Sequence, residues 1–195
     1  MGKTVRTIGV ALVYVALLFG TITSRAEGVN APHFDLPGLD GKRYTDNYLI
    51  GRPTLVVFWA SWCPVCQVEL PKLHELFEET KGRGLRVLAI GFADSEDNIR
   101  HYVKTHSDVF DFPILYDPQD SVAKQFGVIG TPTIYLVNMR GEIEYVTWLI
   151  EDQALGHKLE ILLNARKTGM IEKTGSTQRV LIANIQVINK QSIDK

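Results

Sequence analysis

The feature that most constrains the fold is a strand pattern that runs directly into two cysteines and then into a helical pattern. Residues 54–60 form a nearly continuous apolar run, which is typical of a central strand buried on both faces. Cys63 and Cys66 follow, and apolar residues then recur at helical spacing to about Lys81. The sequence therefore predicts a buried strand, a two-cysteine turn and a helix in direct succession.

The spacing of the two cysteines suits thiol-disulfide exchange. In this reaction one thiolate attacks a disulfide in a partner, and a second thiol nearby resolves the mixed disulfide. A helix that begins at Cys63 would place its sulfur beside unpaired N–H groups and the positive end of the helix dipole, which favour the thiolate. We therefore expect Cys63 to be an exposed nucleophile and Cys66 the deeper resolving thiol, together forming a redox-active disulfide.

A structural disulfide and half of a zinc site are the alternatives for this pair. Closing a loop of about four residues gains only about 2 kcal/mol in the chain-entropy model, so the pair would be a weak structural cross-link. Zinc would need two further ligands, but the chain has no other cysteine and no histidines or carboxylates at evident ligand spacing. The sequence therefore predicts no metal site.

Composition indicates one domain with appendages. The 195 residues are 45% hydrophobic, which is enough for one well-buried core. The net charge is −1 and no basic block is present, so there is no electrostatic basis for binding nucleic acid.

Residues 1–26 have the pattern of an export signal. Lys3 and Arg6 precede an apolar stretch over residues 8–19, and residues 24–26 place small side chains where a signal peptidase cleaves. The apolar stretch is short for a transmembrane helix, which needs about 20 residues. We expect a cleaved signal peptide, with a retained N-terminal membrane anchor as the alternative, and either would place the domain outside the cytoplasm.

The remaining sequence alternates strands with helices. The predicted elements are a hairpin over residues 34–44, strands over 85–93, 113–117, 133–138 and 142–149, and helices over 96–105, 121–126 and 151–166. This order predicts an α/β sandwich on a mixed sheet. In the tail at 167–195, residues 180–188 are partly alternating, so a short edge strand, a partner-binding strand and a disordered end all stay open.

Several motifs taken together resemble a thioredoxin-fold protein. They are the run from Trp59 to Cys66, Pro71 five residues later, the segment 130–133 before a strand, and the hairpin glycine Gly141. The N-terminal hairpin, a central insertion and the export segment narrow the resemblance to the TlpA/ResA-type extracytoplasmic thiol-disulfide oxidoreductases. These carry an AhpC/TSA-redoxin-like domain and are related to the cytochrome c maturation reductases. The resemblance implies a three-layer thioredoxin-like domain at residues 27–166, between the export segment and a C-terminal extension at 167–195 of unassigned role.

The resemblance also implies roles for residues away from the cysteines. Pro132 would be a cis-proline facing the site, and Thr131 would present backbone groups to an extended substrate segment. Glu69 matches a glutamate of similar ResA-type proteins and would accept the proton of Cys66, whereas a solvated glutamate is the alternative.

The residues around the cysteines are expected to contact the substrate. Trp62 would offer a flat apolar surface, while Trp59 would pack in the core. Pro64 and Val65 lie between the two sulfurs and would tune the reduction potential.

These features predict an extracytoplasmic protein thiol-disulfide oxidoreductase that acts as a reductase and needs no organic cofactor or metal. The resemblance implies a membrane thiol-transfer protein as electron donor, and apocytochrome c or copper-site proteins as substrates. A dithiol oxidase, a copper chaperone and a thiol peroxidase are the alternatives. The peroxidase is disfavoured because its nucleophilic cysteine usually follows a threonine by three residues. In this chain the residue three positions before Cys63 is Ala60.

Overall fold

The structure is a computed structural model and describes residues 28–167. The predicted export segment at 1–26 and the possible strand at 180–188 lie outside the described residues. Within residues 28–167, no helix has both the length and the apolar character needed to cross a bilayer.

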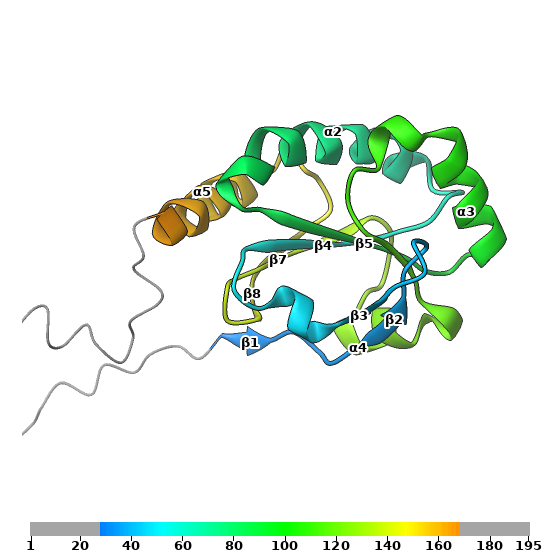
Figure 1. The fold of residues 1–195 in the computed structure, drawn as a ribbon, viewed down its shortest axis with the longest axis horizontal. Coiled ribbons are helices and arrows are strands. Elements are labelled where there is room, and N and C mark those ends of the chain that lie inside the picture. Colours follow the sequence, from blue (N-terminus) through cyan, green and yellow to red (C-terminus); the bar gives the residue numbers. More distant parts are fainter. Residues whose placement is uncertain (1–27, 168–195) are drawn as a thin grey trace, which may run out of the picture.

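A mixed six-stranded sheet forms the centre of the molecule (Figure 1). Its spatial order is β1-β8-β7-β4-β5-β6, in which β4, β5 and β6 pair in parallel and β7 is antiparallel to both β4 and β8. The strands are β1 (Val29–Asn30), β4 (Thr54–Trp59), β5 (Arg86–Gly91), β6 (Ile114–Tyr116), β7 (Thr133–Val137) and β8 (Glu142–Thr147). The predicted mixed sheet is therefore confirmed.

Helices and a small hairpin cover the two faces of this sheet. Figure 1 shows α2 (Pro64–Thr80), α3 (Glu96–Thr105) and α5 (Gln153–Lys167) on one side. On the other side lie α4 (Ser121–Phe126) and the antiparallel pair β2 (Asp35–Pro37) and β3 (Arg43–Thr45). This arrangement is the predicted three-layer sandwich, with the N-terminal hairpin in the outer layer.

The central strand β4 divides the core into two halves because its side chains alternate between the faces. Leu55, Val57 and Trp59 pack with the apolar faces of α2 and α5. Val56 and Phe58 pack with α4 and the hairpin. All six residues of β4 are buried, as expected for a strand covered on both sides.

The sequence did not predict β1, which pairs with β8 at the sheet edge. It has only two residues, too few for a period-two pattern to show. Short 3-10 turns at Asp46–Leu49, Lys81–Arg83, Ser107–Val109 and Pro118–Asp120 were also not predicted. The predicted helices and longer strands agree with the structure to within a few residues at their ends.

Candidate active site

The two cysteines lie where β4 gives way to α2. Cys63 is the N-cap residue of α2, and its sulfur accepts a hydrogen bond from the Cys66 backbone amide at 3.1 Å. Pro64 occupies the start of the helix, where a missing N–H costs nothing. The Cys63 sulfur is therefore at the positive end of the helix dipole, as predicted. Both cysteines are free thiols in this structure.

The expected exposure of Cys63 was wrong. Cys63 is only 3% exposed and Cys66 is fully buried. The physical reason is the packing of the loop before β7: the Cys63 thiol is 3.4 Å from the Thr131 carbonyl oxygen, to which it donates a hydrogen bond. Access to the Cys63 sulfur is thus narrow, whereas Cys66 is the deeper thiol, as expected.

The loop with Thr131 and Pro132 closes the site from the other side. The Thr131–Pro132 peptide bond is cis, which confirms the prediction for this bond. The Thr131 hydroxyl lies 3.1 Å from the Cys66 sulfur and also donates to the Phe58 carbonyl oxygen at 3.4 Å. Thr131 therefore contacts both sulfurs through two different atoms.

Burial distinguishes the resolving thiol chemically. Desolvation, followed by the hydrogen bond with Cys63, raises the pKa of Cys66 to about 12. At neutral pH the Cys66 thiol therefore keeps its proton, and it needs a base before it can act as a nucleophile.

Glu69 is buried and lies one helical turn beyond Cys66. Only 5% of the residue is exposed, so the alternative of a solvated glutamate was wrong. Cys66 and Glu69, together with Pro132 and Ile150, line a small cavity of about 10 Å³.

Two groups hold the Glu69 carboxylate in place. Its Oε2 accepts a hydrogen bond from the Ile150 backbone amide at 2.7 Å, and its Oε1 accepts one from Lys72 Nζ at 3.1 Å. Lys72 also pairs with Glu151 at 2.6 Å, and its bonds to Glu151 and Glu69 raise the pKa of the lysine. The carboxylate is thus oriented from both sides. The sequence analysis did not identify these two partners of Glu69 or the pairing of Lys72 with Glu151.

Residues next to Cys63 and Thr131 in the chain expose apolar side chains. Trp62 is 58% exposed, and its indole nitrogen is fixed by a 2.8 Å hydrogen bond to the Ala93 carbonyl oxygen. Pro64 and Val65 are exposed beside it, and Trp59 is fully buried as predicted. The sequence analysis missed Ile129, which is 93% exposed two residues before Thr131.

A second missed residue, Asp94, positions the turn that precedes the cysteines. Its Oδ2 accepts hydrogen bonds from the Ser61 amide at 2.8 Å and the Ser61 hydroxyl at 2.6 Å. The N-cap of α3 is the next residue, Ser95, whose side chain accepts a hydrogen bond from the Asn98 amide.

Comparison with known proteins assigns the sequence of this chain to a family. The sequence model of the AhpC/TSA family matches residues 28–146, which is more than half of the chain. The chain belongs to the AhpC/TSA family. This stretch contains the cysteine pair, Glu69 and the cis-proline loop.

Relatives of this AhpC/TSA protein share its predicted chemistry. The thiol-disulfide oxidoreductase ResA of Bacillus subtilis is 27% identical over 168 residues, which are 82% of this chain and 93% of that protein. The ResA of Bacillus thuringiensis is 28% identical over 116 residues, 60% of this chain, and the match spans 66% of that relative, just under two thirds of its length.

A solved structure gives the same result for the fold. A protein assigned as the thiol:disulfide interchange protein DsbE from Chlorobium tepidum superposes with a TM-score of 0.61 at 25% identity, covering 73% of this chain and 99% of that one. Together these matches confirm the predicted thioredoxin-like fold and show that the chain is similar to thiol-disulfide oxidoreductases of the ResA type.

Proposed function

We propose that this protein reduces disulfides in other proteins outside the cytoplasm, with Cys63 and Cys66 as its redox pair. The observation that carries the proposal is the difference between the two sulfurs. The Cys63 sulfur accepts an amide hydrogen bond at the N-terminus of α2, while burial raises the pKa of Cys66 to about 12. Cys63 is therefore suited to attack the substrate disulfide, and Cys66 to resolve the mixed disulfide afterwards.

The reaction has two balanced steps. The Cys63 thiolate attacks one sulfur of the substrate disulfide, so that the substrate S–S bond breaks, a Cys63–substrate bond forms, and the released sulfur takes a proton from solvent. Cys66 then loses its proton and attacks the Cys63 sulfur. The Cys63–Cys66 bond forms, the second substrate sulfur leaves as a thiol, and two electrons have passed to the substrate.

Glu69 is proposed to accept the Cys66 proton in the second step. The two side chains lie one helical turn apart on α2 and line the same small cavity of about 10 Å³. Lys72 and the Ile150 amide bind the carboxylate and hold its oxygens in place. Glu69 would thus be a general base that becomes effective when Cys66 moves towards the mixed disulfide.

Substrate binding is assigned to the rim around Cys63. Trp62, Val65 and Ile129 expose apolar surface there, and an unfolded or extended segment carrying a disulfide could cover it. Thr131 and Pro132 would align that segment beside Cys63, and Pro64 with Val65 would tune the reduction potential. The scheme uses no organic cofactor or metal.

The proposed location and partners are supported by the family likeness and by the export-signal pattern of residues 1–26. An extracytoplasmic domain needs a source of electrons, and we assign this role to a membrane thiol-transfer protein. Apocytochrome c and copper-site proteins are the proposed substrates, because both need reduced cysteines before they bind their cofactor or metal.

Insulin reduction tests the proposed activity. With dithiothreitol as electron source, the wild-type chain should accelerate precipitation of the reduced insulin chain, and replacement of both Cys63 and Cys66 by serine should abolish the acceleration. Glu79→Gln, an exposed change on the same helix, is the matched control and should act like wild type. If the double serine variant retains the wild-type rate, the proposal is wrong.

The direction of electron flow is tested by equilibrium with glutathione. A reductase requires a Cys63–Cys66 pair that stays largely oxidised in a glutathione buffer poised near about −220 mV, whereas a dithiol oxidase would be largely reduced there. Each 30 mV corresponds to about 1.4 kcal/mol, so the two directions are well separated by mass spectrometry of alkylated samples.

A further inference from the structure

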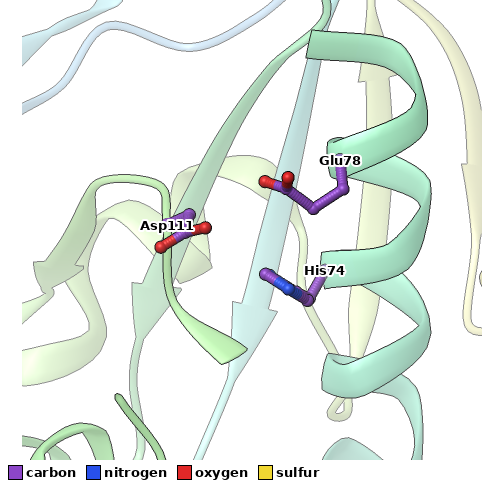
Figure 2. Close-up of side chains that lie close together, drawn as sticks. All are labelled: His74, Glu78 and Asp111. Carbon is purple, nitrogen blue, oxygen red and sulfur yellow. The ribbon is translucent and has the colours of Figure 1, made fainter. Parts of the chain in front are cut away.

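A second cluster of chemically active side chains lies on α2, away from the cysteines. His74 and Glu78 are four residues apart on the helix, and Asp111 comes from the segment between the Ser107–Val109 turn and β6. Figure 2 shows the His74 and Glu78 side chains leaving the helix on the same side and pointing towards Asp111. One ligand atom from each of the three residues lies within 4.8 Å of the other two.

The His74 ring provides an independent sign that this cluster lacks a component. His74 Nδ1 is buried and has no hydrogen-bond partner among the described residues. Buried polar atoms are normally satisfied, and neutral imidazole nitrogen is a common metal ligand. The imidazole beside the two carboxylates therefore carries a buried nitrogen to which the described residues offer no hydrogen-bond partner.

The charges around the ring are also unbalanced. Two carboxylates, Glu78 and Asp111, approach the same imidazole. Lys81 pairs with Glu78 and lies 5.8 Å from the centre of the Phe77 ring, so it supplies one positive charge against two negative ones. A divalent cation would compensate both carboxylates at once.

We propose that His74, Glu78 and Asp111 form a binding site for Zn²⁺, with water as the fourth ligand. One imidazole and two carboxylates are ligands that Zn²⁺ accepts, at bond lengths of about 2.0 to 2.2 Å. Tetrahedral bonds of that length bring ligand atoms to about 3.5 Å from one another, so rotations of the side chains close the observed cluster. Two of the three residues, Glu78 and Asp111, are exposed.

The proposed ion would cross-link the catalytic helix to the inserted part of the fold. His74 and Glu78 belong to α2, whereas Asp111 follows the insertion helix α3. Phe77 and Phe112 already pack edge to face at this junction, with ring centres 5.6 Å apart. Zinc should therefore stabilise the folded chain by binding it in preference to the unfolded chain.

The test uses the full, untagged chain with Cys63 and Cys66 replaced by serine, so that no thiol can bind the metal. Titration of Zn²⁺ against a chromophoric chelator should show one equivalent bound, and Zn²⁺ should raise the thermal midpoint. In this background His74→Ala and Asp111→Asn should each weaken binding about tenfold or more and remove the thermal shift. Glu79→Gln, the matched control for charge on α2, should change affinity less than about twofold.

Three results would overturn the zinc site. The cysteine-free chain binds no zinc, Asp111→Asn binds it as tightly as the parent, or Glu79→Gln weakens binding as much as Asp111→Asn does. Asp111 is exposed, so its variant is expected to fold, and circular dichroism checks this directly. None of these outcomes depends on the redox activity, which requires Cys63 and Cys66 instead.

Discussion

At the level of single residues, the proposed chemistry depends on two sulfurs with unequal surroundings. Cys63 accepts the amide of Cys66 at the start of α2, whereas Cys66 is enclosed with Glu69 beside a cavity of about 10 Å³. The electrostatic help for Cys63 comes from the backbone, and the proton acceptor for Cys66 comes from a buried side chain. A single helix therefore supplies both functions within two turns.

The buried Cys66 thiol should make stability depend on alkaline pH. Burial raises its pKa from the ordinary value of 9.0 to about 12, so between these values the unfolded chain releases the proton and the folded chain keeps it. The unfolded state then binds fewer protons, and the free energy of unfolding falls as pH rises. In reducing buffer, wild type should lose stability relative to Cys66→Ser from about pH 9 upwards. Urea unfolding at several pH values measures this, and a difference that stays constant would contradict the assigned pKa.

Replacement of Glu69 should affect one step of the reaction. Glu69→Gln keeps a side chain of similar size and an oxygen for the Ile150 amide, but it removes the base. Resolution of the mixed disulfide should slow about a hundredfold, while the first attack by Cys63 changes little. Single-turnover kinetics with a fluorescent disulfide peptide separates the two rates. Glu75→Gln, an exposed change on the same helix, is the control, and equal rates in all three proteins would remove Glu69 from the mechanism.

At the scale of elements, short helices depend on individual anchors. Helix α4 has six residues and no side-chain hydrogen bond from its own N-cap. Asp117 replaces that cap: the residue is 1% exposed, and its carboxylate accepts from the Val122 amide at 2.9 Å and the Ala123 amide at 2.8 Å. This anchor places Val122 and Phe126 against the central strand β4.

Loss of the Asp117 anchor should destabilise the fold. Asp117→Ala leaves buried amides without partners, so the free energy of unfolding should fall by about 2 to 3 kcal/mol. Ser95→Ala removes the exposed cap of α3 and should cost about 1 kcal/mol. Chemical denaturation compares the two variants. A loss for Asp117→Ala no larger than that for Ser95→Ala would show that α4 is held by packing alone.

At the scale of the whole molecule, the sequence predicted what local patterns encode. Ser121–Phe126 was predicted at its observed bounds because Gly127 follows it with a positive φ of 72°, which ends a helix readily. The paired strands and the cysteine turn were predicted for similar local reasons. The cis bond before Pro132 was expected from the family resemblance alone.

Contacts between distant segments could not be predicted in this way. The Ile150 amide binds Glu69 across 81 positions, and the Thr131 carbonyl oxygen receives the Cys63 thiol across 68 positions, so the burial of Cys63 was missed. Asp111 likewise approaches His74 only after folding. Contacts between residues so far apart in the sequence leave no periodic pattern in it. They are fixed by the packing of the whole sheet and its helices.

Trapping of the mixed disulfide shows whether Cys63 attacks the substrate and Cys66 resolves the intermediate. At neutral pH, Cys66→Ser incubated with a disulfide peptide should accumulate a covalent adduct, and peptide mapping by mass spectrometry should locate it at Cys63. Cys63→Ser should form almost none under the same conditions. Rapid adduct formation at Cys66 in Cys63→Ser, or no adduct in Cys66→Ser, would contradict the assignment of the two sulfurs.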